Sequence, residues 1–152
     1  MVIEVGAQAP DLELRDQHGT PFRLSAHRGG RIVLIFYPLA FSGVCGSELD
    51  ALRDEFLPAL PGDVTVATVS VDSIFAQRAW ADRQGYTFRL LSDFWPHGQA
   101  ARAYGVFDEE NGFAKRGTFV IDGEGVVRWR VVNPIPQARD VTEYLKVLAE
   151  LP

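Results

Sequence analysis

Apolar positions along the chain change their period several times, and each change predicts the border of a secondary-structure element. Residues 9–29 contain short alternating runs on either side of a polar turn at 18–20, which predicts two strands joined as a hairpin. Residues 31–38, RIVLIFYP, form a continuous apolar run rich in β-branched and aromatic side chains. Such a run predicts a central strand that is buried on both faces of a sheet.

The period becomes that of a helix after Ser42. The apolar residues of 45–56 are separated by four, three and four positions, so they share one face of a helix that ends before Pro58. A second apolar run, at 64–72, follows the turn at 60–63 and predicts another buried strand. Two buried strands separated by a helix form a βαβ unit, which implies parallel pairing with a right-handed crossover.

The rest of the chain alternates short helices and strands. The patterns predict helices over 73–85, 97–105 and 138–151, and strands over 88–93, 117–122 and 126–132, the last two joined as a hairpin. The elements combine into one α/β domain over residues 1–152, with a mixed central sheet flanked by helices. This order is that of a thioredoxin-like fold with the opening hairpin as an N-terminal β-hairpin extension. A fold of this kind does not by itself define a function.

Composition and charge narrow the class of protein. The net charge is -5 over 152 residues and basic residues are scattered among acidic ones, so we expect no nucleic-acid partner. The longest apolar run is about half of the ~20 residues that a membrane span requires, and the N-terminal segment lacks the pattern of a signal peptide. We therefore expect a soluble, cytoplasmic protein without a membrane partner. The three histidines, at 18, 27 and 97, have no metal-ligand spacing, so we expect neither a metal nor a cofactor.

Cys45 is the only cysteine, and it lies where the first central strand gives way to a helix. An isolated cysteine on an apolar helix face is usually a small inert hydrophobic residue. Here it follows the carboxyl end of a central strand, where open α/β sheets place their sites, and a helix N-terminus favours thiolate over thiol. Ser42 is expected either to cap this helix or to point its hydroxyl at a group bound near the sulfur. Pro38 marks the end of the strand.

Pro38, Ser42, Cys45 and Glu48 together spell P-x-x-x-[S/T]-x-x-C-x-x-E, which resembles the signature around the peroxidatic cysteine of the peroxiredoxins. The resemblance covers nearly the whole chain. It includes the opening segment 6–19, the middle segment 90–107 and the segment 114–129, whose counterpart in the family carries an active-site arginine. By its position in that last segment, the arginine is Arg116.

The resemblance implies that the Cys45 thiolate attacks one oxygen of a hydroperoxide, becomes a sulfenic acid and releases water or an alcohol. The Ser42 hydroxyl, the Cys45 backbone N–H and the Arg116 guanidinium would donate hydrogen bonds to the leaving oxygen. Pro38 would shield the sulfur from bulk water. Glu48 would orient Arg116, unless it is simply a solvated carboxylate on the helix surface.

Two departures from the family pattern change these expectations. Ser42 stands where threonine is usual, which keeps the donor but loses a methyl group that fixes the rotamer. In one branch a resolving cysteine follows the peroxidatic one by five residues, and Asp50 occupies that position here. Without a second cysteine, the resemblance implies the one-cysteine branch, with an external thiol reductant that is either a low-molecular-weight thiol or a thioredoxin- or glutaredoxin-type protein. The family also implies a homodimer.

Other interpretations of the same residues stay open. One is a thiol-based peroxide sensor or redox-relay module, and another is a thioredoxin-like binding domain whose cysteine is inert. Aromatic residues near the motif could line an apolar entrance suited to organic hydroperoxides, although such residues more often belong to the core. These residues are Phe36, Tyr37, Phe41 and Trp95.

Overall fold

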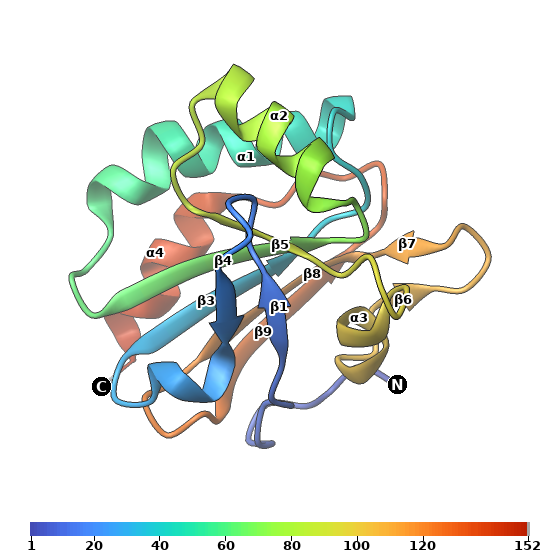
Figure 1. Cartoon of the computed structure of the whole chain (residues 1–152). Coiled ribbons are helices and arrows are strands. Elements are labelled where there is room, and N and C mark those ends of the chain that lie inside the picture. Colours follow the sequence, from blue (N-terminus) through green and yellow to red (C-terminus); the bar gives the residue numbers. More distant parts are fainter. Residues whose placement is uncertain (152) are drawn as a thin grey trace.

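The computed structural model describes residues 1–151 and contains a seven-stranded mixed sheet with helices packed on both faces (Figure 1). The strand order is β2-β1-β5-β4-β3-β8-β9. The strands of this sheet are β1 (Glu13–Arg15), β2 (Pro21–Arg23), β3 (Arg31–Phe36), β4 (Val64–Ser70), β5 (Arg89–Ser92), β8 (Arg116–Ile121) and β9 (Val127–Asn133). The helices are α1 (Gly43–Ala51), α2 (Ile74–Gln84), α3 (Gln99–Ala103) and α4 (Val141–Glu150).

The centre of the sheet agrees with the predicted βαβ unit. Strand β3 pairs in parallel with β4, and α1 lies between them in the chain. On its other side β3 pairs with β8 in antiparallel orientation. The opening hairpin is present, with Leu14 opposite Phe22, and Arg15 of β1 pairs with Ser92 of β5. The hairpin therefore extends the main sheet at one edge.

Three local features differ from the sequence prediction. The helix expected over 45–56 is α-helical only to Ala51, continues as a π-helix, η2 (Leu52–Phe56), and ends in a 3-10 turn, η3 (Leu57–Ala59). Segment Leu24–His27 is a 3-10 turn, η1, where a strand residue was expected. A second sheet, β6 (Phe107–Asp108) with β7 (Phe113–Ala114), was not predicted because two-residue strands carry no measurable period.

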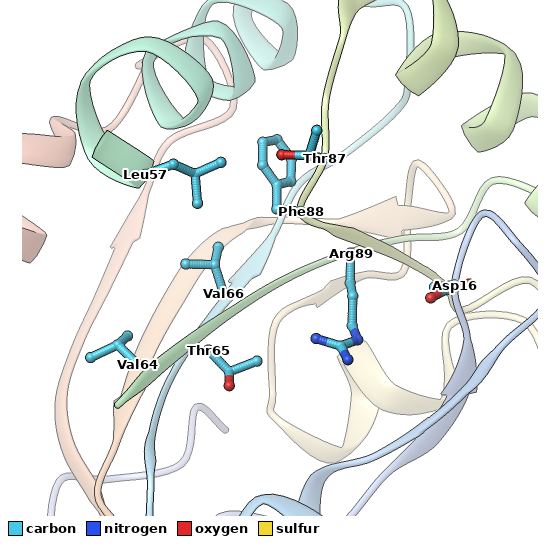
Figure 2. Close-up of a pocket in the computed structure, with 8 residues that line it drawn as sticks. All are labelled: Asp16, Leu57, Val64, Thr65, Val66, Thr87, Phe88 and Arg89. Atoms are coloured by element: carbon cyan, nitrogen blue, oxygen red, sulfur yellow. The ribbon is translucent and has the colours of Figure 1, made fainter. Parts of the chain in front are cut away.

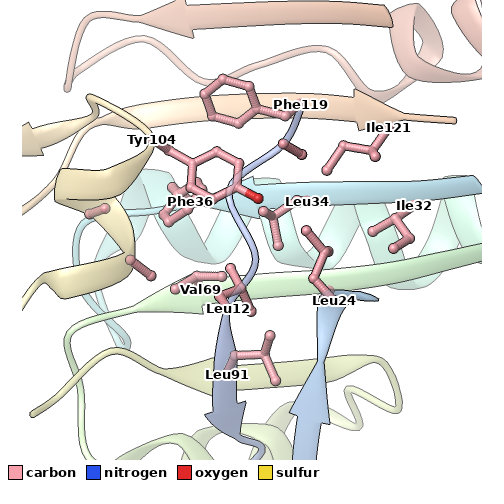
Figure 3. Packing of buried hydrophobic residues seen from close by; sticks show 14 of the residues in the cluster. Leu12, Leu24, Ile32, Leu34, Phe36, Val69, Leu91, Tyr104, Phe119 and Ile121 are labelled. Carbon is pink, nitrogen blue, oxygen red and sulfur yellow. The ribbon is translucent and has the colours of Figure 1, made fainter. Parts of the chain in front are cut away.

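The two faces of the main sheet bury different kinds of side chain. We call one the apolar face: it lies under α3 and the N-terminal segment, and Phe36, Tyr104 and Phe119 meet there with ring centroids 5.1 to 6.0 Å apart (Figure 3). We call the other the charged face: it lies under α1, α2 and α4, and it includes Cys45. Because side chains alternate along a strand, each central strand supplies residues to both faces.

No helix within residues 1–151 is long and apolar enough to cross a membrane.

Candidate active site

Cys45 lies in the first turn of α1, a few residues after the end of β3, and its side chain is completely buried. The helix begins at Ser42, whose backbone is extended and whose carbonyl accepts the N–H of Gly46. The N–H of Cys45 belongs to the first turn, so it has no carbonyl partner within the helix. The thiol and an unused backbone donor therefore lie next to each other at the positive end of a helix.

Arg116 and Glu48 meet at the sulfur. Arg116 Nη1 lies 3.2 Å from Cys45 Sγ and donates to Glu48 Oε1 at 2.7 Å. Arg116 is the first residue of β8 and is 2% exposed, although the sequence placed it just before the strand. Glu48 is 4% exposed, so the interpretation of Glu48 as a solvated carboxylate is wrong. Arg116 Nε also donates to the carbonyl of Ile135, which holds the guanidinium in one orientation.

Arg139 completes this group, and the sequence did not indicate it. Its Nε and its backbone N–H both donate to Glu48 Oε2, at 2.7 and 2.8 Å, and its Nη2 donates to Glu48 Oε1 at 2.9 Å. It lies just before Asp140, the residue that caps α4. It belongs to a polar segment without apolar period, and 91 positions separate it from Glu48, so no local pattern marks it.

The three buried ionic groups carry one excess positive charge. Burial alone would raise the pKa of Glu48, but the hydrogen bonds and charge of Arg139, together with the charge of Arg116, hold that pKa below its ordinary value. Burial alone would lower the pKa of Arg139, but its bonds to Glu48 raise it. Two guanidiniums thus face one carboxylate beside the Cys45 sulfur. A buried cation without a counter-charge is costly, so the site is electrostatically complementary to an anion.

Behind the ionic groups lies a layer of hydroxyl groups. Arg139 Nη1 donates to Thr118 Oγ1 at 3.1 Å, and Thr118 Oγ1 lies 2.8 Å from Tyr144 Oη. Burial raises the pKa of Tyr144, so this phenol stays neutral. The layer fixes Arg139 from the side that faces away from Cys45, with one group from β8 and one from α4.

Ser42 and Pro38 lie near the thiol without touching its charge partners. The Ser42 hydroxyl donates to the carbonyl of Leu39 at 2.9 Å and makes no capping bond to α1. The capping bond expected as one alternative for Ser42 is therefore absent. Pro38 is buried in the segment that joins β3 to α1.

The four aromatic candidates do not form one entrance. Phe36 is completely buried on the apolar face, so it lines no entrance. Trp95 is 81% exposed and lines a different groove together with Phe94, so it is also not part of an entrance at Cys45. Tyr37 is buried on the charged face in the same cluster as Cys45. Phe41 is half exposed in the segment before α1.

Cavities lie at both ends of the sheet. One of about 380 Å³ lies between α1 and α2, beside the turn that carries Cys45. Another, of about 440 Å³, lies where β4 and β5 begin, and Arg89 and Phe88 are among its lining residues (Figure 2). The second cavity contains none of the candidate residues. Within residues 1–151, no three His, Cys, Asp or Glu side chains are grouped as a metal site.

A buried thiol at a helix N-terminus, held against a guanidinium at the end of a central strand, defines a thiol-based redox protein of thioredoxin-like fold. The chain belongs to the AhpC/TSA family, whose model matches residues 5–130. It is 45% identical over 152 residues to alkyl hydroperoxide reductase E of Mycobacterium tuberculosis, covering 99% of each chain. It is 36% identical over 154 residues to bovine Peroxiredoxin-2, covering 95% of this chain and 76% of the relative.

The fold is confirmed by solved structures. The crystal structure of Enterococcus faecalis AhpC superimposes with a TM-score of 0.87 at 29% identity, covering 98% of this chain and 92% of that one. The predicted membership in the peroxiredoxins, in a one-cysteine branch similar to alkyl hydroperoxide reductase E, is also confirmed. The protein is therefore an enzyme of the thiol-dependent peroxidase class.

Proposed function

We propose that the protein reduces hydrogen peroxide and organic hydroperoxides by a one-cysteine mechanism with a sulfenic acid intermediate at Cys45. The observation that carries this proposal is the 3.2 Å contact between Arg116 Nη1 and Cys45 Sγ inside a buried group with one excess positive charge. A Cys45 thiolate supplies the missing negative charge. The thiolate is the nucleophilic form of cysteine.

In the proposed reaction, Cys45 Sγ attacks one oxygen of the hydroperoxide and the O–O bond breaks. The sulfur keeps that oxygen as a sulfenic acid, and the other oxygen leaves as an alkoxide or hydroxide, which is protonated to alcohol or water. Arg116 and the free N–H of Cys45 are the donors aimed at the reacting oxygens. The Ser42 hydroxyl joins them by rotating away from the carbonyl of Leu39.

We assign supporting roles to two further residues. Both oxygens of Glu48 accept hydrogen bonds from arginines, so Glu48 orients Arg116 and does not act as a base. Pro38 closes the loop over the sulfur and has no N–H to offer to competing acceptors. Both are positioning residues in this scheme.

Regeneration needs an external thiol. Asp50, at the position of a resolving cysteine in one branch, accepts a hydrogen bond from the Tyr86 hydroxyl at 2.6 Å. The chain contains a single cysteine, so no second thiol of the chain reaches the sulfenic acid. An outside thiol attacks the oxidised sulfur, forms a mixed disulfide and releases water, and a second thiol then frees Cys45.

We further propose that the chain acts as a single domain, in the cytoplasm, as a homodimer. A lone cysteine is typical of a reducing compartment. For the homodimer, the support is a set of exposed aromatic side chains, Phe75, Phe94 and Trp95, which line one groove and are 54 to 81% exposed. Exposed apolar clusters of this kind mark interaction surfaces.

Steady-state peroxide consumption tests the proposed function. With excess small thiol, wild-type protein should turn over many equivalents of hydrogen peroxide and of an organic hydroperoxide, and Cys45→Ser should turn over none. A single stoichiometric burst, with a protein partner trapped as a disulfide, would instead identify a peroxide sensor or relay. Absence of turnover and of a burst in both the wild type and Cys45→Ser would identify a binding domain with an inert cysteine.

A further inference from the structure

The groove of about 380 Å³ between α1 and α2 has the size of a small-ligand site. It lies on the charged face, on the outer side of the helical turn that carries Cys45. The ring of Trp80 packs against Phe41 and Tyr86, with centroids 5.8 and 5.3 Å away, and these three rings form its apolar part. Ser42 is the one lining residue of this groove to which the proposed peroxide chemistry gives a role.

The groove reaches the backbone on both sides of Cys45. Gly43 and Gly46 line it, and a Cβ added at Gly43 would meet nothing within 4 Å. A Cβ added at Gly46 would meet only the Trp80 ring, at 4.0 Å. The turn between the groove and the sulfur is also weakly held, because glycine is a poor helix former and Ser42 makes no capping bond. A ligand in the groove is therefore separated from Cys45 by one turn of helix that contains two glycines and has no side-chain cap.

The two helices place opposite charges in the groove. Asp50 comes from α1, and its Oδ1 accepts the Tyr86 hydroxyl at 2.6 Å and lies 3.5 Å from Arg53 Nη1, while 45% of its side chain stays exposed. Arg83 comes from α2 and is exposed, and within residues 1–151 no carboxylate lies within 4.0 Å of its guanidinium. A carboxylate that is paired through one oxygen only, and a guanidinium with no carboxylate partner among residues 1–151, thus line a single cavity.

These charges select among the thiols that could reduce Cys45. A neutral thiol engages neither charge, and a thiol with one charge engages only Asp50 or only Arg83. A thiol that carries both an ammonium and a carboxylate group engages both, with its carboxylate on the planar guanidinium of Arg83. Asp50 also occupies the sequence position of the resolving cysteine in one branch of the family. A thiol bound to Asp50 would therefore lie near the position of that cysteine.

We propose that this groove binds the external reductant and that the reductant is a zwitterionic, amino-acid-type thiol. The inference rests on the proposed peroxidase function, since it names the thiol that acts on the sulfenic acid. The sulfur of the bound thiolate attacks Cys45 Sγ, an S–S bond forms and the S–O bond breaks, releasing hydroxide that is protonated to water. A second such thiol attacks the mixed disulfide, which frees the Cys45 thiolate and leaves a symmetric disulfide.

Thiol–disulfide exchange tests the groove without peroxide. Reduced protein is mixed with four disulfides: cystine (zwitterionic), cystamine (cationic), dithiodipropionate (anionic) and bis-hydroxyethyl disulfide (neutral). The rate of mixed-disulfide formation at Cys45 is followed by intact-protein mass spectrometry. Each variant is compared with the wild type for the same disulfide, so differences between leaving groups cancel.

Arg83→Gln should slow the reactions of cystine and dithiodipropionate by about two- to fivefold, the range of one partly exposed ion pair, and leave the other two unchanged. Asp50→Asn should slow cystine and cystamine by a similar factor. Arg83→Lys, which keeps the charge, should retain most of the preference. Arg78→Gln is the matched control, because Arg78 lies on the same helix and pairs with Asp82.

The inference is overturned if Arg83→Gln or Asp50→Asn changes the rate of mixed-disulfide formation by the same factor for all four disulfides. The reductant would then be a protein thiol. Single-turnover oxidation by hydrogen peroxide is measured on the same samples. Fast oxidation with a flat profile rejects the groove and keeps the peroxidase. Slow oxidation with a charge-dependent profile rejects the peroxidase and supports thiol recognition by the groove.

Discussion

Strand β8 presents Phe119 to one face of the sheet and Arg116 to the other, and both side chains are at most 2% exposed. Phe119 meets Phe36 and Tyr104 on the apolar face, where its contacts are with aromatic rings. Arg116 meets Glu48 and the Cys45 sulfur on the charged face. The two side chains are about equally buried, but burial has opposite effects on the folding free energy. Burying the apolar ring of Phe119 is favourable, whereas burying the charge of Arg116 is costly.

The comparison of Phe119 with Arg116 shows how one strand contributes to stability on one face of the sheet and to the candidate active site on the other. Alternation along β8 lets apolar burial on one face stabilise the strand that holds a buried guanidinium on the other. Arg116 and Arg139 share one carboxylate, so the cost of burying them is not fully offset within the protein. In the proposed mechanism, this remaining positive charge is compensated first by the Cys45 thiolate and then by the developing oxyanion.

Phe119→Ala should produce the largest change in stability and little change in chemistry. Removing a fully buried phenylalanine ring costs about 3–5 kcal/mol of unfolding free energy. Denaturant unfolding measures it, and Val132→Ala, at a partly exposed site on β9, should stay within about 0.5 kcal/mol. The rate constant for peroxide in the folded protein should stay within about twofold. If Phe119→Ala instead lowered this rate constant strongly and left stability unchanged, the apolar face would not be the stabilising one and the comparison of the two faces would fail.

Arg116→Met should do the reverse. It removes the donor at 3.2 Å from the sulfur, so the rate constant for peroxide should fall by about a hundred- to a thousandfold, as for the loss of one oxyanion donor. Glu48 keeps Arg139 as its partner, so the folded state should persist. Stopped-flow fluorescence measures the rate. Arg128→Met, at an exposed arginine paired with Asp122, should leave it unchanged, and an equal loss there would contradict the assignment.

The pH dependence of stability should reveal the buried carboxylate. The pKa of Glu48 is lowered in the folded state from an ordinary value of 4.5, so the unfolded chain binds its proton first as the pH falls. The resulting stabilisation is fully present above about pH 4.5 and is lost as the pH falls through the lowered folded pKa.

Unfolding curves of wild type and Glu48→Gln from neutral to acidic pH measure this dependence. The stability gap between the two proteins should narrow on acidification. Asp54→Asn is the control, because Asp54 and Arg53 form an exposed ion pair that solvent screens. The difference in stability between the wild type and Asp54→Asn should therefore be small at every pH. A constant gap for Glu48→Gln would contradict the lowered pKa, because it would show that folding leaves the pKa of this carboxylate unchanged.

Ser42→Ala should have the smallest effect. The hydroxyl bonds to the Leu39 carbonyl, so its loss should cost about 1 kcal/mol of stability or less. If the hydroxyl also rotates toward the leaving oxygen, the peroxide rate constant should fall by about tenfold and Ser42→Thr should restore it. An unchanged rate constant would confine Ser42 to its bond with Leu39.

Much of the fold was predictable because its signals are local. The continuous apolar runs of β3 and β4 and the helical spacing after Ser42 define the central unit, and the structure confirms it. The π-helix at Leu52–Phe56 was not predictable, because a widened turn keeps nearly the same apolar spacing. The assignments to a single domain, to the cytoplasm and to a homodimer stay predictions.

The site was predictable only where a motif placed residues together. Cys45 and Glu48 share one turn of helix, and resemblance supplied Arg116 from a distant strand. Arg139 contacts Glu48 across 91 positions and Tyr144 enters from the last helix, so only the folded chain brings them to the site. The direction of the Ser42 hydroxyl is likewise a property of the loop conformation and not of its spacing.

The central claim is that the buried group with excess positive charge activates the lone thiol. Its most direct test is the second-order rate constant for hydrogen peroxide with wild-type protein at neutral pH, measured in a single turnover and compared with free cysteine. We predict a rate constant larger by at least about a hundredfold, as expected for a preorganised electrostatic site. A rate constant equal to that of free cysteine would contradict the account.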